Sequence, residues 1–383
     1  MKKIGYLIFA FFFTFFRIFS RVNRKKVFCI MTHDSSEDSN VGMIVQQLRK
    51  ESNEYKFYYI SKEETSKVKN GGAVAKLFSF FLVKPYHLAT SQYVFLDNIF
   101  LPMAYLHFSS KVKVVQLWHG TGTIKKFGQD VNTGELWKLE RNANRTITHL
   151  IVNSEKMKKQ YAKAFGVDNE KVFVEGLPRT DVLFRQDKLE RDREAFLEKY
   201  PELKGRRCIL YAPTFRDQET DKPKVEMDID QFVKELPGDT VLLLKLHPFV
   251  AKNFSLTKEQ KERYQGRVYN MSSYRDINTL LHVSDVLITD YSSIIFEYCL
   301  QEKPMLFYAY DLGTFTKEGR GFYEPYETFV PGPVARTSSE CIEYLTGILS
   351  GESFDRDEVR RFKEENFQYF DGKSTERVVK LVK

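Results

Sequence analysis

The chain has 383 residues, of which 42% are hydrophobic and 29% charged, a composition that excludes an intrinsically disordered protein. The formal net charge of +8 favours anionic partners such as nucleotides, phosphates or anionic lipid. The four cysteines stand far apart, without a Cys-x-x-Cys pair or a Cys/His cluster, so the pattern argues against a zinc site and a disulfide framework and fits a reducing cytosol.

The first segment is apolar and cationic. An uncharged apolar run covers residues 4–16, and only basic charges precede Asp34. The run is shorter than the roughly 20 residues of a membrane span, and no signal-peptide cleavage site follows it. We interpret residues 1–22 as an amphipathic helix that lies with residues 2–20 in an anionic membrane surface. The alternative is an apolar helix docked on the protein's own body.

Short apolar runs then alternate with longer mixed segments, as in α/β proteins. In the first half we predict strands at 26–31, 55–60, 93–97, 112–118, 147–153 and 171–176. We predict helices at 41–51, 72–82 and 154–165, the last capped by Ser154. The charged segment 187–207 is typical of a solvated linker helix at a domain boundary.

The alternation restarts after this linker. Further strands are predicted at 208–214, 240–248, 267–271, 285–290 and 304–309, with helices at 228–236, 276–283 and 291–301. The pattern indicates an α/β protein of two facing Rossmann-like domains, 23–186 and 208–354, with a cleft at the carboxyl ends of the strands. We expect a helix in 355–383 to pack back toward the N-terminal domain.

Two histidines end apolar strands at equivalent places in the two halves. His119 stands in VVQLWHGTGTIKKFG, and His247 stands in LLLKLHP. Alternation places Lys245 on the same side of its strand as His247, and a cation there needs an anion to offset its burial. Either histidine alone could be structural, but the repeated position favours a functional role.

A strand-to-helix junction follows in DVLITDYSSIIFEYCLQEKP. The strand ends at Asp290, and Ser292 and Ser293 precede a predicted helix whose free N–H groups suit a phosphate. Ser is also an ordinary N-cap residue, which is the structural alternative. Glu297 lies one turn into the helix, where it could accept hydrogen bonds from a ribose diol.

Three loops supply further candidates. Arg320 stands between two glycines in GRG and suits a pyrophosphate. Thr214 and Arg216 follow a strand in YAPTFRD, whereas GLPRTD at 176–181 is at least as well explained as a turn. The chain has neither a G-x-x-x-x-G-K-[ST] loop nor a G-x-G-x-x-G after the first strand, and no acidic cluster resembles a magnesium site. We therefore expect no cofactor and no metal.

Five ordered motifs resemble those of the CDP-glycerol glycerophosphotransferases of wall teichoic acid synthesis. The motifs are WHGTGTIKKFG, YAPTFRD, LLLKLHP, SDVLITDYSSIIFEY and GRGFYEPYETFVPGP, and they cover about 110 to 335. The resemblance implies a GT-B-type fold, an acceptor domain at 23–186, a nucleotide-binding domain at 208–354, and peripheral attachment to the cytoplasmic side of the cell membrane.

The resemblance also implies roles for individual residues. His119 resembles the first essential histidine of the family and the base, and His247 resembles the second, beside Lys245. Ser292, Ser293 and Glu297 resemble contacts to the nucleotide diphosphate, and Arg320 resembles the pyrophosphate arginine. Thr214 and Asp290 are added as nucleotide-side candidates. Candidates on the acceptor side are Trp118, Gly120, Thr121, Lys125 and Lys126.

Among these enzymes the chain most resembles the primase, because it is compact and has its own amphipathic start. That implies transfer of sn-glycerol 3-phosphate from CDP-glycerol to the ManNAc hydroxyl of undecaprenyl-diphosphate-linked ManNAc–GlcNAc, with release of CMP. The alternatives are a poly(glycerol phosphate) or ribitol-phosphate polymerase, or a nucleotide-sugar glycosyltransferase. We expect association with other teichoic acid synthesis enzymes and no nucleic-acid partner.

Overall fold

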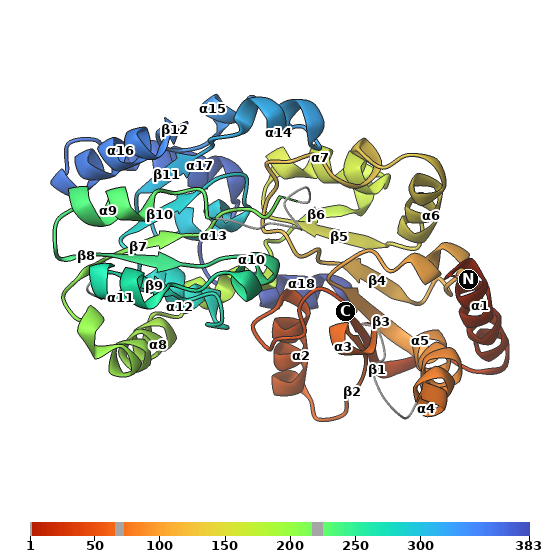
Figure 1. Ribbon diagram of the computed structural model, residues 1–383. Helices are drawn as coiled ribbons and strands as arrows, with labels where there is room; N and C mark the ends of the chain where they lie inside the picture. The colour runs from red at the N-terminus through yellow and green to blue at the C-terminus, as the bar shows by residue number, and fades with distance from the viewer. Residues whose placement is uncertain (1, 66–72, 217–224, 265) are drawn as a thin grey trace. The chain divides into compact units, whose positions relative to one another are not determined.

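A computed structural model describes residues 2–65, 73–216, 225–264 and 266–383. Residue 72 of the predicted helix 72–82 and Asp217 of YAPTFRD lie outside the described residues. The chain divides into two compact units (Figure 1). Unit 1 comprises Met1–Gly122, Lys126–Phe184 and Asn366–Lys383, and unit 2 comprises Thr123–Lys125 and Arg185–Glu365.

Unit 1 is built on a parallel sheet of six strands in the order β2-β1-β3-β4-β5-β6. The strands are β1 (Asn23–Met31), β2 (Lys56–Ser61), β3 (Ser91–Leu96), β4 (Lys113–Gln116), β5 (His149–Val152) and β6 (Val172–Val174). Because β2 lies on one side of β1 and all later strands lie on the other, the order reverses between β1 and β3. Ligands of open α/β sheets bind at such a reversal, outside the carboxyl ends of the strands.

The strands of unit 1 are apolar almost throughout because helices cover both faces of the sheet. Phe28 and Ile30 pack in one cluster with Phe9 and Phe13 of α1 (Lys2–Phe19). Val27 and Cys29 point to the opposite face, which is covered by α2 (Asn40–Glu51) and α18 (Ser374–Val382). The remaining helices of unit 1 are α3 (Lys62–Thr65), α4 (Ala73–Phe78), η1 (Ser79–Val83), α5 (Lys84–Thr90), η2 (Leu101–Tyr105), η3 (Gly128–Asp130), α6 (Gly134–Asn144), α7 (Glu155–Phe165), η4 (Asn169–Lys171) and η5 (Pro178–Phe184).

Unit 2 has a second parallel sheet of six strands, in the order β12-β11-β10-β7-β8-β9. Its strands are β7 (Arg207–Tyr211), β8 (Thr240–Leu244), β9 (Val268–Asn270), β10 (Val286–Thr289), β11 (Met305–Tyr308) and β12 (Val334–Ala335). The order reverses between β7 and β10, which is the arrangement of a dinucleotide-binding Rossmann sheet.

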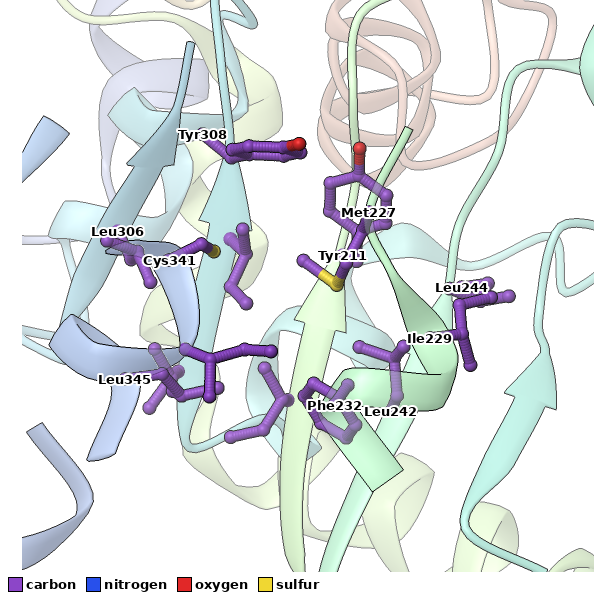
Figure 2. Close-up of a cluster of buried hydrophobic side chains, with 14 of the residues drawn as sticks. Tyr211, Met227, Ile229, Phe232, Leu242, Leu244, Leu306, Tyr308, Cys341 and Leu345 are labelled. Atoms are coloured by element: carbon purple, nitrogen blue, oxygen red, sulfur yellow. The ribbon is translucent and has the colours of Figure 1, made fainter. Parts of the chain in front are cut away.

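Helices enclose this sheet as well. They are α8 (Gln186–Lys199), η6 (Pro201–Leu203), α9 (Ile229–Glu235), α10 (Pro248–Asn253), α11 (Lys258–Tyr264), α12 (Ile277–Val283), α13 (Ile294–Cys299), α14 (Leu312–Glu318), α15 (Tyr326–Phe329), α16 (Ser338–Ser350) and α17 (Arg356–Asn366). Figure 2 shows one face of the core, where Phe232 of α9 and Leu345 of α16 meet Leu242 of β8 and Leu306 of β11.

Every predicted strand is present, although its bounds differ: β1, β3 and β7 begin earlier than predicted, β2 ends one residue later, and the other predicted strands are shorter. The two-residue β12 was missed because so short a segment carries no alternation. The helices α5, α6 and α16 were also not predicted. The segment 187–207 forms α8 and η6, and α8 contacts α12 within unit 2. The closing segment holds two helices: α17 packs in unit 2, and α18 packs in unit 1.

Candidate active site

In unit 1 two histidines meet where the strand order reverses. His33 follows the carboxyl end of β1, and His119 follows the end of β4. Their rings stack with centroids 4.1 Å apart and planes 11° apart. The ring of Trp118 lies 4.0 Å from that of His119. His119 therefore has an aromatic neighbour from the end of β1 and another from its own loop.

The backbone just before His119 is strained. Trp118 has a φ of 57°, a left-handed conformation that a bulky side chain rarely adopts and that costs about 1–3 kcal/mol. Hydrogen bonds hold it: the Trp118 N–H donates to Gln116 Oε1 at 2.9 Å, and Asn40 Nδ2 donates to the Trp118 carbonyl at 3.0 Å. Arg179 Nη1 donates to the carbonyl of His119 at 3.0 Å. These contacts determine where the imidazole points.

The loop after His119 is held in the same way. The Tyr161 hydroxyl donates to the Gly120 carbonyl at 3.3 Å, and Asn153 Nδ2 donates to the carbonyl of the buried Thr121 at 2.6 Å. A Cβ at Gly120 would lie 3.3 Å from the Gly122 carbonyl, which is tighter than an ordinary contact. Gly120 and Thr121 therefore shape the loop, and their carbonyl oxygens are already hydrogen bonded.

The protonation state of His119 follows from its surroundings. Its Nδ1 lies 3.3 Å from the backbone carbonyl of Asp97, which can only accept, so Nδ1 carries the proton and Nε2 has the free lone pair. Burial, and then the neighbouring His33, lower the pKa of His119 to about 3. A neutral imidazole with a fixed tautomer is the form that a general base needs.

Asp97 links the same strand ends. Its carboxylate accepts the backbone N–H groups of Thr32 at 3.0 Å, His33 at 3.1 Å and Asp34 at 2.9 Å. Burial raises the pKa of Asp97 to about 6 although these donors oppose the shift. The carboxylate thus positions the His33 loop, and the carbonyl of the same residue positions His119.

In unit 2 the two strands at the reversal are tied by an ion-pair network. The buried Asp290 accepts the Thr214 N–H at 2.8 Å and Arg216 Nη1 at 2.8 Å. Arg216 also binds Asp311 through Nε at 2.7 Å and Nη2 at 2.9 Å. Asp290 and Arg216 therefore join the ends of β7 and β10, and the nucleotide contact expected for Asp290 stays a prediction.

Hydroxyl groups gather beside this network. Ser292 and Ser293 are partly exposed before α13, and Ser293 makes no capping hydrogen bond. Thr214 Oγ1 is buried and has no hydrogen-bond partner in the described part of the chain. Glu297 is buried in the first turn of α13. Thr214, Ser292 and Ser293 thus remain candidates for phosphate or ribose contacts.

His247 and Lys245 differ in exposure. His247 is exposed, and its ring stacks on Phe215 with centroids 4.8 Å apart. Lys245 Nζ donates to the carbonyls of Ser272 at 3.2 Å and Tyr274 at 2.5 Å, and burial lowers its pKa. Two carbonyl groups therefore meet the lysine where the sequence led us to expect a phosphate, and they anchor the loop after β9.

A second cation, Lys125, lies next to the loop that holds Arg320. Arg320 is exposed, and Gly321 has a φ of +69° that glycine adopts without strain. Lys125 forms a backbone bridge with Phe322, and the Tyr323 N–H donates to the Ile124 carbonyl at 3.1 Å. Lys125, expected on the acceptor side, therefore belongs to unit 2 next to the Arg320 loop. Lys126 lies in unit 1 and is partly exposed.

A family model for CDP-Glycerol:Poly(glycerophosphate) glycerophosphotransferase matches residues 11–383. The chain belongs to this family. It is 36% identical over 386 residues to a teichoic acid poly(ribitol-phosphate) polymerase of Bacillus spizizenii, covering 99% of this chain and 59% of that protein. It is 26% identical to the teichoic acid glycerol-phosphate primase of Bacillus subtilis, covering 91% and 90%.

Solved structures confirm the fold of this glycerophosphotransferase chain. The wall teichoic acid polymerase TagF superposes with a TM-score of 0.79 at 22% identity, covering 98% of this chain and 93% of that chain. The fold is α/β of the GT-B type, with two Rossmann-like domains, as predicted. The chain spans 59% of the length of its 36% identical polymerase relative.

Sequence reasoning missed several residues of the candidate site. His33 and Asp97 were not named, although Thr-His-Asp directly follows the apolar strand 26–31 and Asp-Asn follows 93–96. Polar residues at the ends of adjacent parallel strands were the available signal. Arg179 lies in the GLPRTD loop, which was judged at least as well explained as a turn, and Asn40 gave no such signal because it acts on the backbone of a loop far away in sequence.

Proposed function

We propose that the protein transfers a polyol phosphate from a CDP-activated donor to a hydroxyl group of a lipid-linked teichoic acid intermediate, releasing CMP. The observation that carries this proposal is His119, a neutral imidazole with a fixed tautomer at the strand reversal of unit 1, inside the WHGTGT motif. Family membership supports the reaction class.

His119 is the proposed base. Its Nε2 takes the proton of the acceptor hydroxyl as the oxygen attacks the phosphorus of the donor, and the bond from phosphorus to the CMP oxygen breaks. Such proton transfer contributes roughly 10²–10⁴-fold to rate. His119 must be neutral to accept a proton, and its lowered pKa keeps it neutral at neutral pH.

Unit 2 supplies the proposed nucleotide side. Thr214, Ser292 and Ser293 offer hydroxyl donors at the carboxyl edge of β7 and β10, and Arg320 with Lys125 offers positive charge. Charge builds on the leaving CMP phosphate during transfer, and fixed donors and cations lower the barrier by stabilising it. His247 serves as a donor or proton source in the same unit.

The donor has two candidates. The sequence motifs led us to CDP-glycerol and to a single transfer onto undecaprenyl-diphosphate-linked ManNAc–GlcNAc. Identity of 36% to a ribitol-phosphate polymerase, against 26% to a glycerol-phosphate primase, favours CDP-ribitol and repeated transfer. Transfer from CDP-glycerol and transfer from CDP-ribitol would use the same residues and the same displacement at phosphorus.

Peripheral attachment to the cytoplasmic side of the cell membrane is part of the proposal. In α1, Phe9 and Phe13 are buried in the unit 1 core, whereas Ile4, Phe11 and Phe19 are 62%, 65% and 73% exposed. No helix in the described residues combines the length and apolar character needed to cross a bilayer. An apolar exposed face next to Arg17 and Arg21 is typical of a helix lying in the membrane interface.

Radiolabelled CDP-glycerol and CDP-ribitol, each offered with a soluble lipid-disaccharide analogue, test the reaction. We expect label transfer from one of the two donors. The length of the product then distinguishes a single transferred polyol phosphate from a polymer. His119→Asn should lose roughly 10²–10⁴-fold in kcat, and His247→Ala should also lose activity. The control His282→Gln changes a histidine that pairs with Glu190 on α8. No transfer from either donor, or full activity in both site variants, would refute the proposal.

A further inference from the structure

Unit 1 has a groove beside α1, away from the carboxyl ends of its strands. It runs between α6 and the segment formed by η2 and residues 106–112, and it consists of two hollows of 480 and 460 Å³ that share Asn142. Thr146 and Thr148 line one end, near the start of β4 and β5. His119 follows the other end of β4, so the groove is separate from the candidate active site.

The groove is suited to an anion. Arg145 and the hydroxyl-bearing Ser109 and Ser110 line the larger hollow, and Lys138 lines the smaller one. Among the residues that the structure describes, neither Arg145 nor Lys138 has a carboxylate partner, and no acidic residue lines the larger hollow. Glu135 lines the smaller hollow, where its carboxylate pairs with Lys3. A guanidinium with nearby hydroxyls is the usual chemistry of phosphate recognition.

Apolar residues lie in and near the groove. Phe108, which lines the larger hollow, packs against Phe13 of α1 with ring centroids 5.0 Å apart. Lys3 of α1 forms an ion pair with Glu135 of α6 at 3.5 Å, so the first turns of these two helices lie close to each other. Leu136 of α6, next in the chain to Glu135 of the smaller hollow, is 44% exposed. A molecule in the groove would thus have its anion held by Arg145 and apolar surface close by.

We propose that this groove binds the phosphate headgroup of an anionic membrane lipid, with its acyl chains along Leu136 and the exposed face of α1. The inference rests on the proposed membrane attachment and adds a defined lipid site to it. Free inorganic phosphate would meet the same cations but would gain nothing from the apolar residues, so a lipid is the better ligand.

Two matched pairs of substitutions test the site. Lys138→Gln with Arg145→Gln removes both groove cations. Lys50→Gln with Lys380→Gln removes two exposed cations from α2 and α18, which cover the opposite face of the same sheet. Circular dichroism confirms folding of each variant. The readouts are flotation with phosphatidylcholine vesicles containing phosphatidylglycerol, and thermal shift with dihexanoyl phosphatidylglycerol or with inorganic phosphate.

We expect the groove variant to bind anionic vesicles roughly tenfold or more weakly, while the control pair changes binding by less than about twofold. The short-chain lipid should raise the Tm of the wild type but not that of the groove variant. Inorganic phosphate alone should leave the Tm of both proteins unchanged. Equal loss in both pairs would reduce the effect to general charge attraction and overturn the proposal. An equal thermal shift with phosphate would leave an anion site without lipid selectivity.

A further variant separates this inference from membrane attachment itself. Phe11→Ser alters the exposed face of α1 without touching a groove residue. If Phe11→Ser loses vesicle binding and the groove variant does not, attachment stands and the lipid site is wrong. If neither variant loses binding, the proposed attachment is wrong as well.

Discussion

At the scale of single residues, His119 is placed by contacts that its own motif does not contain. The carbonyl of Asp97 sets its tautomer, the ring of His33 stacks on it, and Arg179 holds its carbonyl oxygen. A histidine that accepts a proton at Nε2 must keep this nitrogen directed at the acceptor hydroxyl, so its ring must not rotate. His33 is therefore best described as a positioning residue.

His33→Ala should lower kcat by roughly 2- to 10-fold, since an aromatic pair is worth about 0.5–1.5 kcal/mol. His33→Phe keeps the stack and should retain most of the activity. Because burial and the His33 neighbour both lower the pKa of His119, the acid limb of kcat/KM should move to higher pH in His33→Ala. An identical loss from His33→Ala in a His119→Asn background would contradict this role.

Arg216 stabilises the local structure of unit 2 through two ion pairs. Arg263 forms the same number of ion pairs on the surface and therefore serves as its control. Arg216 and Arg263 each pair with two carboxylates, but their side chains are 8% and 54% exposed. Arg216→Met should cost about 3–5 kcal/mol of unfolding free energy because it leaves Asp290 buried without its partner. Arg263→Met should cost at most about 1 kcal/mol. Urea unfolding of both variants measures the difference.

Adding Asp290→Asn to Arg216→Met should recover part of the lost stability, because it removes the uncompensated charge at Asp290. A double variant as unstable as the sum of the single changes would show that the charge at Asp290 is not the cause. The pair matters for the site because it joins the ends of β7 and β10, where Thr214 and Ser292 lie.

At the scale of elements, α1 has two apolar faces with different tasks. Phe13 is 1% exposed and packs against Phe108, whereas Phe11 is 65% exposed. The helix is docked on the protein, as the alternative expectation held, and it also presents an exposed apolar face; its contact with a membrane stays a prediction. The residues of the buried face stabilise unit 1, and the exposed face is available to lipid.

Phe13→Ala should therefore cost about 3–5 kcal/mol of unfolding free energy, while Phe11→Ala should cost less than about 0.5 kcal/mol. Vesicle flotation should give the reverse order, with Phe11→Ala the weaker binder among folded variants. If both substitutions changed only stability, or if Phe11→Ala bound vesicles as well as the wild type, the exposed face would have no membrane role.

At the scale of the whole molecule, unit 1 is completed by the last part of the chain. The buried Asp181 accepts the N–H groups of Ser374 at 2.9 Å and Thr375 at 2.8 Å, and so caps α18. Val378, Val379 and Val382 of α18 then fill the core on one face of the sheet. Unit 1 can reach its full stability only after the segment forming unit 2 has been made.

Asp181→Ala should destabilise unit 1 by about 2–4 kcal/mol, since it removes a helix cap and leaves buried donors unsatisfied. Hydrogen exchange should report loss of protection in α18 and α2, with the strands of unit 2 unchanged. Asp371→Ala is the control, because this exposed carboxylate pairs with Arg377 near the same helix and should cost less than about 1 kcal/mol. Equal loss in both units would contradict a local role.

The alternation of apolar runs predicted every strand of more than two residues, because a parallel sheet buried on both faces requires short continuous apolar segments. The same logic placed His119, His247 and the Ser292–Ser293 junction at strand ends, where ligands bind. The helix α16 was not predicted although Cys341, Ile342, Leu345 and Ile348 form an apolar stripe at helical spacing, which packs in the core of unit 2.

Local pattern thus specified the elements, the family and the two histidines. Tertiary structure alone decided which polar groups have partners inside the protein: Asp290 is paired with Arg216, and Lys245 donates to two carbonyls. It also brought His33 and Asp97 to His119. A sequence records which groups can bind or titrate, but a buried charge is satisfied by partners far along the chain, and only the folded backbone determines which ones.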